Sequence, residues 1–339
     1  RTCYSFVIYN HDFSSALHDA KGECAAQGNQ DIAVHVGTLH FTCQEVIRHF
    51  EGDMHEGDVF AINDPYAGGT HFSDVRLIRP IFADGEIIAF SQSNGHWSDV
   101  GGSVPGSFDV AAREMFREGL RITPVRLFDK GRFCKDVAHL IASNTRDPAS
   151  IIGDIQAQAQ ATQVCEREIL RLVGKYGRDT VETGLAAVQD YVERSARQRI
   201  AALPDGSWET VDFIDRDPAG DEGMIPIRIR MTIKGDRVTY DFTGDHRLDL
   251  QLGVRRDVLG GGGRHEDVLP RSAAQLRLLS LLRHHRARGL DRRCEMADRG
   301  HRLPDAVRED HELDLRDVVE ADAGARARLR LQSRISAHR

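Results

Sequence analysis

The sequence lacks any run of about 18 consecutive apolar residues, so it offers no candidate for a membrane-spanning helix. It also lacks a CxxC pair. Its six cysteines stand singly along 339 residues, which indicates free thiols in a reducing compartment and argues against a disulfide framework or a cysteine-based zinc site. The chain begins Arg1-Thr2-Cys3, without an initiator Met or a signal-peptide pattern. We therefore expect a cytoplasmic protein with no membrane association, present as a fragment without its true N-terminus.

Familiar catalytic motifs are also absent. No Gly-x-Ser-x-Gly nucleophile elbow occurs. The glycine run at 260–263 is not followed by the Gly-Lys-Ser or Gly-Lys-Thr that completes a phosphate-binding loop. Neither serine-hydrolase chemistry nor a P-loop of this chain's own is therefore indicated.

Residues 246–339 contain no Lys, Phe, Tyr, Trp, Asn or Thr, although 20 of them are Arg. Without aromatic side chains a packed core is hard to build, so we expect this tail to be non-native or disordered. A disordered basic tail is one interpretation. Such tails favour Lys, which is missing here, so we prefer a second interpretation. In it, a GC-rich gene is read in the wrong frame after about Gly244.

Charge is distributed unevenly along the chain. Residues 1–245 hold 25 of the 45 Lys and Arg residues, but 37 of the 52 Asp and Glu residues. This acidic balance argues against a nucleic-acid-binding surface, which requires clustered positive charge. A small-molecule substrate is the better expectation for this part of the chain.

Hydrophobic patterning predicts an α+β (mixed α/β) fold with a strand-and-loop-rich N-terminal part. The predicted strands there are 6–9, 15–22, 59–62, 75–82 and 86–91, and the last two are joined by a turn at Asp84-Gly85. A helix is predicted over 42–50. The middle is helical over 151–176 and 180–202, and a β-hairpin near 225–243 follows, with its turn at Gly235-Asp236.

We expect three regions. Residues 1–150 hold the active-site loops, and residues 151–245 add a helical segment and the β-hairpin to the same domain. Residues 246–339 are the Arg-rich, aromatic-free tail, which we expect to be out of frame.

Two polar loops repeat a His-x-x-Asp pattern, each after a glycine close to a predicted strand. His71 and Asp74 lie in the first loop, residues 63–74, and His96 and Asp99 lie in the second, residues 94–102. Imidazole and carboxylate ligands together suit Mn, Fe or Zn. Two His and one carboxylate also leave coordination positions open for water or substrate, as a catalytic metal requires.

We predict that the metal ligands are His71, Asp74 and His96. Asp64 and Asp99 are candidates for a second shell or a general base, and His35 is a third candidate catalytic residue. A lone His is more often a structural residue than a ligand. Repetition of the pattern in adjacent loops favours a metal site, but spacing alone leaves both interpretations open.

At these residues the sequence resembles the hydantoinase B / 5-oxoprolinase B family, which includes N-methylhydantoinase B and the large subunits of acetone and acetophenone carboxylases. The resemblance covers residues 1 to about 244. Its most specific stretches are Asn63-Asp64-Pro65-Tyr66 and Gly95-His96-Trp97-Ser98-Asp99. Further matching stretches are 12–17, 34–37, 57–62, 68–71, 118–122, 143–146, 153–158 and 240–244.

The resemblance implies a B-type subunit of an ATP-dependent cyclic amidohydrolase that acts on hydantoin or a 5-oxoproline-like ring. It also implies a hetero-oligomer, in which a hydantoinase A-type partner binds ATP and phosphorylates the substrate or bicarbonate. The absence of an ATP motif in this chain agrees with an ATP site in the partner. In the carboxylase branch, a His, an Asp three residues later and a second His hold Mn. That pattern falls on His71, Asp74 and His96, so Mn or Zn is expected here.

Two alternatives stay open. One is the large subunit of a Mn-containing, ATP-dependent acetone- or acetophenone-type carboxylase. The other is an inactive truncated product. The sequence of the tail favours the inactive product. Codons can be chosen for residues 295–302 and 307–315 that, when read one base out of frame, encode stretches resembling the C-terminal half of the family.

Overall fold

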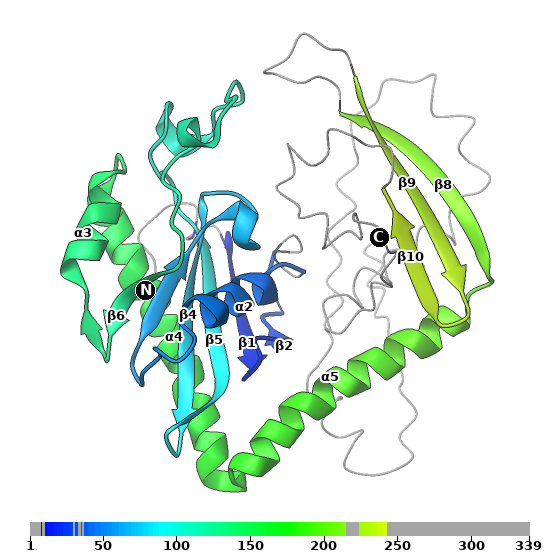
Figure 1. Ribbon diagram of the computed structural model, residues 1–339, viewed down its shortest axis with the longest axis horizontal. Helices are drawn as coiled ribbons and strands as arrows, with labels where there is room; N and C mark the ends of the chain where they lie inside the picture. Colours follow the sequence, from blue (N-terminus) through cyan, green and yellow to red (C-terminus); the bar gives the residue numbers. More distant parts are fainter. Residues whose placement is uncertain are drawn as a thin grey trace, which may run out of the picture. The chain divides into compact units, whose positions relative to one another are not determined.

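The computed structural model describes residues 8, 11–29, 31–32, 35, 37–214 and 224–242, and it confirms the predicted α+β fold. At its centre lies a seven-stranded antiparallel sheet with the order β2-β1-β5-β4-β3-β6-β7 (Figure 1). The strands are β1 (Phe13–Asp19), β2 (Cys24–Gln27), β3 (Val59–Ile62), β4 (Asp74–Ala83), β5 (Glu86–His96), β6 (Val125–Asp129) and β7 (Arg132–Phe133). The tail expected over residues 246–339 lies outside the described residues.

The hairpin of β4 and β5 contains the longest strands of this sheet. Its turn falls at Asp84-Gly85, as predicted, with φ angles of 53° and 80°. Positive φ at both central residues is the type I′ geometry, whose twist matches that of the two strands. Because the strands run antiparallel, the start of β4 lies beside the end of β5, and Asp74 pairs directly with His96.

One face of the sheet is covered by α2 (Leu39–His49), which confirms the helix predicted over 42–50. Alternation along β3 turns Phe60 and Ile62 toward this helix. There they pack with Cys43 and Val46 in an apolar cluster. The loop before α2 is thereby held against the sheet, close to the polar ends of β4 and β5.

The opposite face is covered by α3 (Lys135–Ser143) and α4 (Pro148–Tyr176) (Figure 1). Val59 and Leu77 of the sheet share a core with Ile151 and Ile155 of α4. The first turn of α4 is capped by the Asp147 side chain, which accepts a hydrogen bond from the Ser150 backbone N–H at 3.2 Å. The prediction of a helix over 151–176 is therefore confirmed, with three more residues at its start.

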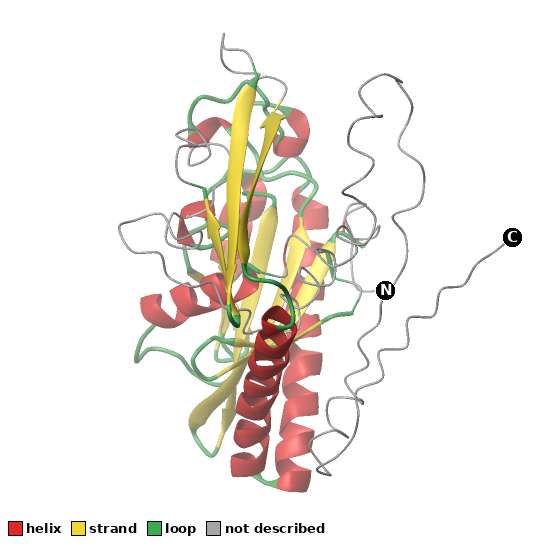
Figure 2. Ribbon diagram, turned by 90° about the vertical axis from the view of Figure 1, so that its right-hand side faces the viewer, coloured by secondary structure: helices red, strands yellow, loops and turns green. Residues whose placement is uncertain are grey.

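A second long helix, α5 (Arg178–Ala201), follows α4 after a turn; its first turns pack against the end of α4, and the two helices then diverge (Figure 1), although they overlap in the view of Figure 2. It leads to a three-stranded antiparallel sheet in the order β10-β9-β8, made of β8 (Gly206–Ile214), β9 (Ile225–Lys234) and β10 (Arg237–Asp241). The predicted hairpin is confirmed in β9 and β10, and β8 is an additional strand. Arg197 of α5 contacts Asp236 in the hairpin turn at 3.0 Å.

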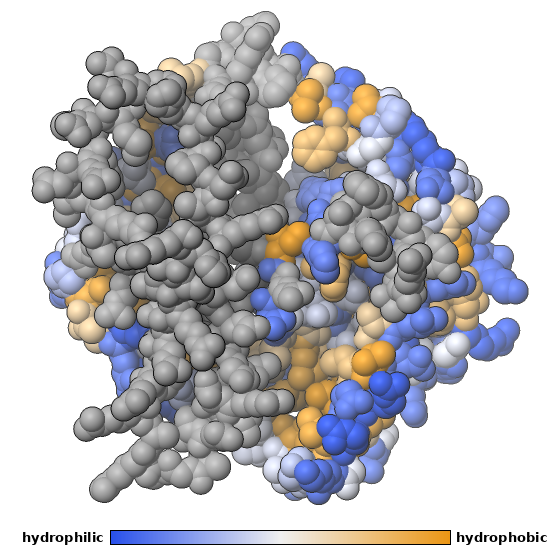
Figure 3. All heavy atoms as spheres, turned by 180° about the vertical axis from the view of Figure 1, so that it is seen from behind, coloured by the Kyte–Doolittle hydropathy of each residue, from blue (hydrophilic) through white to orange (hydrophobic). Residues whose placement is uncertain are grey.

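Two expectations from composition can be compared with these elements. The four cysteines in the described part, Cys24, Cys43, Cys134 and Cys165, are free thiols, as predicted. No helix within the described ranges combines the length and apolar character needed to cross a membrane. Figure 3 shows hydrophobic and hydrophilic side chains interspersed over the rear of the described part, an ordinary mixture for a protein surface.

Candidate metal centre

The two His-x-x-Asp loops meet at one end of the central sheet. His71 lies in the loop that enters β4, Asp74 is the first residue of β4, and His96 is the last residue of β5. Since β4 and β5 are antiparallel neighbours, their polar ends are forced together. The His71 Nε2 atom lies 3.2 Å from Asp74 Oδ2, and the rings of His71 and His96 are 5.0 Å apart between centroids. The three predicted ligands thus form one cluster.

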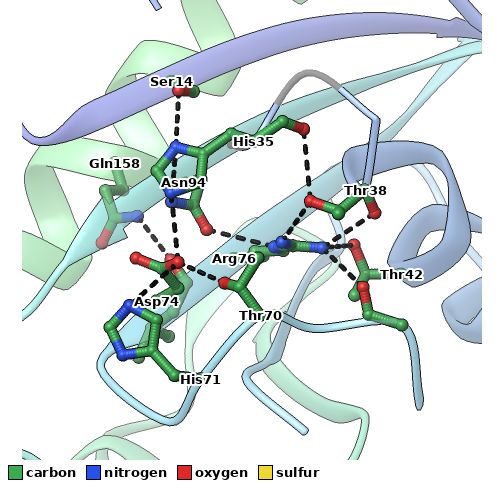
Figure 4. Close-up of polar contacts among 12 residues, drawn as sticks. Ser14, His35, Thr38, Thr42, Thr70, His71, Asp74, Arg76, Asn94 and Gln158 are labelled. Carbon is green, nitrogen blue, oxygen red and sulfur yellow. Dashed lines mark hydrogen bonds and ion pairs between the residues drawn. The ribbon is translucent and has the colours of Figure 1, made fainter. Parts of the chain in front are cut away.

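The two oxygens of the Asp74 carboxylate have different surroundings. Oδ2 accepts a hydrogen bond from Thr70 and lies 3.1 Å from Nε2 of His35 (Figure 4). Oδ1 is buried and has no hydrogen-bond partner, and the same holds for Nδ1 of His96. An unpaired buried acceptor costs about 1–3 kcal/mol. A bound cation would satisfy both the unpaired carboxylate oxygen of Asp74 and the unpaired ring nitrogen of His96, so these side chains fit a divalent metal.

The charge states of these groups also suit a metal. Burial favours the neutral acid of Asp74, but hydrogen bonds from His35 and His71 outweigh it and hold the pKa of this carboxyl well below its usual range. Burial, helped by repulsion from His71, lowers the pKa of His96. At neutral pH the cluster therefore offers a carboxylate and an uncharged imidazole, the forms in which these side chains bind metals.

Asp12 lies beside Asp74, although no role was predicted for it from the sequence. Among the described residues, Asp12, His35 and Asp74 each offer a ligand atom within 4.8 Å of the others, a group that shares only Asp74 with the predicted ligands. Asp12 lies just before β1, and its carbonyl accepts a hydrogen bond from the His96 backbone N–H at 3.1 Å. The pairing of β1 with β5 places it there. The matching stretch at 12–17 was the available signal, but nothing in its spacing connects it to His71 or His96.

Asp64 lies in the same loop as His71 but is bonded elsewhere. Its Oδ1 accepts from the Tyr66 backbone N–H at 2.9 Å, and its Oδ2 accepts from Nε and Nη2 of Arg121 at 2.8 and 2.6 Å. The Asp64 carbonyl also accepts from the Gly69 N–H. These contacts shape the loop that presents His71, so they favour a positioning contribution for Asp64.

Asp99 is similarly occupied. Its carboxylate accepts four hydrogen bonds, two from backbone N–H groups of its own loop and two from Arg146. These bonds and the nearby Arg146 outweigh burial and lower the pKa of the Asp99 carboxyl. The structure therefore brings His35, but neither Asp64 nor Asp99, into hydrogen-bond contact with the predicted ligands, and the catalytic roles of all three stay predictions.

Comparison with known proteins places this site in a family. The family model described as hydantoinase B/oxoprolinase matches residues 1–249. The β subunit of caprolactamase from Pseudomonas jessenii is 35% identical over 67% of this chain and 39% of its own length. 5-Oxoprolinase 1 from Arabidopsis thaliana is 30% identical over 69% of this chain and 20% of its own length. The chain thus spans less than half the length of these relatives.

Two solved structures share the fold. The crystal structure of the ATP-dependent caprolactamase from Pseudomonas jessenii matches with a TM-score of 0.65 at 35% identity, over 68% of this chain and 39% of that one. Nucleotide-free acetone carboxylase also matches with a TM-score of 0.65, at 22% identity, over 71% of this chain and 34% of that one. The second likeness concerns the fold alone. From the match over residues 1–249, the chain belongs to the hydantoinase B/oxoprolinase family.

Proposed function

We propose that this chain is a B-type subunit of an ATP-dependent cyclic amide hydrolase, acting on hydantoin or a 5-oxoproline-like ring. In that reaction water adds across a ring C–N bond and leaves a carboxylate together with a free amine from 5-oxoproline or a carbamoyl NH2 from hydantoin. The observation that carries the proposal is the cluster of His71, Asp74 and His96, with its unpaired buried acceptors, in a chain of this family. Residues 1–150 would then supply the active-site loops, and residues 151–245 would complete the domain.

A divalent metal, Mn or Zn, would be held by His71, Asp74 and His96, with Asp12 close enough to assist. Such an ion polarises a substrate carbonyl or activates water when bound. The protein's own part is to keep Asp74 ionised and His96 uncharged, and to hold both rings in place. Asp64 would contribute by fixing the loop that carries His71, and Asp99 would stabilise the loop that follows His96.

ATP would be supplied through a partner. One relative is the β subunit of caprolactamase from Pseudomonas jessenii, an enzyme that is ATP-dependent. This chain has no P-loop in its sequence. We therefore propose a hetero-oligomer with a hydantoinase A-type ATP-binding subunit.

The first experiment is metal analysis of the purified full chain and its variants. His71→Ala and His96→Ala should each lower the bound Mn or Zn, because each removes a ligand. His139→Ala, which changes an exposed His on α3, is the matched control and should retain the wild-type content. Unchanged metal content in both His71→Ala and His96→Ala would refute the proposed metal site.

The second experiment identifies the substrate. The chain is mixed with an A-type subunit and ATP, and ring opening of hydantoin and 5-oxoproline is measured with and without ATP. A parallel reaction with acetone and bicarbonate tests the carboxylase alternative, which no specific observation favours because that likeness extends only to the fold. Carboxylation without any ring opening would contradict the amide hydrolase.

The remaining alternative, an inactive product with an out-of-frame tail, is decided at the gene. Sequencing across the Gly244 codon tests for a one-base insertion or deletion. A clean open frame, together with ring-opening activity of the chain with its partner, would refute that alternative.

A further inference from the structure

Two buried side chains, Ser14 and His35, form a hydrogen-bonded line that ends at the Asp74 carboxylate. Ser14 Oγ lies 2.7 Å from Nδ1 of His35, and Nε2 of His35 lies 3.1 Å from Asp74 Oδ2 (Figure 4). Ser14 and His35 are at most 2% exposed. Both ring nitrogens of His35 therefore have a partner within hydrogen-bond distance.

The orientation of the Asn94 side chain beside His35 is fixed by Arg76, whose guanidinium can only donate hydrogen bonds. Arg76 is fully buried, and its Nε lies 3.1 Å from the Asn94 side chain. Since a guanidinium has no acceptor, the Asn94 atom facing it is the amide oxygen. The Asn94 amino group consequently faces His35, 3.3 and 3.4 Å from its two ring nitrogens.

The line from Ser14 through His35 ends at the Asp74 carboxylate, which can only accept hydrogen bonds when it is ionised. An ionised Asp74 has no hydrogen to give, so Nε2 of His35 carries the hydrogen and donates it to Oδ2. Nδ1 is then the acceptor, and the Ser14 hydroxyl donates to it. This arrangement fixes one tautomer of His35, as partners of ring nitrogens commonly do.

Arg76 also anchors the backbone that carries His35. Its Nη1 and Nη2 donate to the carbonyl and the hydroxyl of Thr38 at 2.9 and 2.8 Å. The same Thr38 hydroxyl contacts the His35 carbonyl at 3.2 Å. Arg76 thus holds the His35 loop and the Asn94 amide together, and the position of the imidazole is set from two sides.

We propose that His35 is a positioning residue for Asp74, held as the Nε2–H tautomer by its contacts with Ser14 and Asp74, and kept in place by Arg76 through Asn94 and Thr38. The line ends at Oδ2, the oxygen that also lies 3.2 Å from Nε2 of His71, and it leaves Oδ1 without a hydrogen-bond partner. This proposal rests on the proposed function in one respect, because it takes Asp74 to be a metal ligand. His35 would then be neither a ligand nor a catalytic base, although its ring lies beside the ligands.

The tautomer is tested without any metal. The full chain is labelled with ¹⁵N in histidine, and two-bond correlations between ring nitrogens and ring hydrogens are recorded in the presence of a chelator. The His35→Gln spectrum identifies the His35 signals by their loss. We expect an Nε2–H ring with an unprotonated Nδ1. An Nδ1–H ring, or one with hydrogen on both nitrogens, would overturn the proposal.

The positioning role is tested by Mn²⁺ and Zn²⁺ titration calorimetry. Loss of a side chain that orients a ligand typically weakens metal binding about 10–100-fold, so His35→Ala should raise the Kd by that factor. His35→Gln keeps an N–H near the position of Nε2 and should restore most of the affinity. Ser14→Ala leaves Asp74 untouched and should weaken binding by a smaller factor than His35→Ala.

His71→Ala, which removes a proposed ligand, separates failure of the metal site from failure of the positioning role of His35. If both His71→Ala and the wild type bind metal equally, the proposed metal site fails, and the tautomer measurement alone decides the present inference. If His71→Ala abolishes binding while His35→Ala matches the wild type, positioning by His35 is refuted. Complete loss of binding in His35→Gln would make His35 a ligand and also refute it. If circular dichroism shows that His35→Ala does not fold, the metal affinities of His35→Gln and Ser14→Ala still test the positioning role of His35.

Discussion

Hydrogen bonds between Asp99 and Arg146 tie the loop that follows β5 to the segment before α4. The two residues are 47 positions apart, and Arg146 Nη1 donates to Asp99 Oδ2 at 2.9 Å while its backbone N–H donates to Oδ1 at 3.1 Å. Arg146 also donates to the carbonyls of Gly101 and Gly102. A single guanidinium therefore ties the Gly-rich loop to the segment that precedes α4.

This contact predicts that Asp99 contributes to stability and leaves metal binding unchanged. Asp99→Ala should lower the free energy of unfolding by about 1–3 kcal/mol, because a nearly buried charged acceptor of several hydrogen bonds is lost. Arg146→Ala should cost a similar amount, and the double variant should cost less than the sum of the two. Urea unfolding and metal titration measure both quantities. Loss of metal binding or activity at unchanged stability would instead support the catalytic role predicted from the sequence.

The buried Arg76 gives a second prediction. Arg76→Met removes the donors to the Thr38 and Gly68 carbonyls, to two hydroxyls and to Asn94. Each acceptor left unpaired costs about 1–3 kcal/mol, so the total loss should exceed about 3 kcal/mol. Arg48→Ala is the matched control. Arg48 is 70% exposed and paired with Glu45, and such surface pairs contribute at most about 1 kcal/mol. Equal effects of the two variants would contradict the assigned role of Arg76.

Local signals account for the parts of the fold that the sequence predicts well. The Asp84-Gly85 turn fixes the β4–β5 hairpin, and that hairpin is why His71, Asp74 and His96 meet as expected. Neighbouring antiparallel strands bring the start of one to the end of the other, whatever the rest of the chain does. The position of β1 beside β5 has no such local cause, since the two strands are separated by β2, α2, β3 and β4 in the chain. Asp12 was missed for that reason.

Arg76 illustrates a second limit. Within the predicted strand 75–82, a charged residue beside apolar ones indicates an outward-facing position. The structure buries this side chain completely, because Thr38, Thr42 and the Gly68 carbonyl arrive from other segments to accept its hydrogen bonds. Burial of a charge depends on partners that no pattern within the strand reveals.

A third prediction concerns Gly68, in the loop that presents His71. Its φ is +93°, and a Cβ added there would overlap the Cβ of Phe41 in α2. Gly68→Ala should therefore destabilise the protein through backbone strain and through a clash with the helix. Gly85→Ala is the control, because Gly85 has a φ of +80° but no atom within 4 Å of an added Cβ. It should cost only the strain, about 1–2 kcal/mol. Thermal unfolding of both variants gives the comparison, and a Gly68→Ala protein no less stable than Gly85→Ala would contradict the close approach.

The last prediction concerns His18 on β1, which lies under α2 and away from the candidate ligands. Its side chain is fully buried, and burial, with repulsion from His40, lowers its pKa from 6.5 to about 3. Between these values the unfolded chain binds a proton at His18 and the folded chain does not. Stability is therefore complete above pH 6.5 and falls as the pH decreases toward about 3, by up to about 1.4 kcal/mol per pH unit.

The variant His18→Leu removes this titration and keeps an apolar side chain in a buried position. Urea unfolding at several pH values from 7 to 4 should show the wild type losing stability more steeply than His18→Leu, with the gap widening only below about pH 6.5. Other titrating groups are common to both proteins and cancel in this difference. Replacing the exposed His139 by Gln should leave the wild-type slope unchanged. Parallel pH profiles for the wild type and His18→Leu would mean that His18 takes up its proton in the folded protein, which its burial beneath α2 argues against.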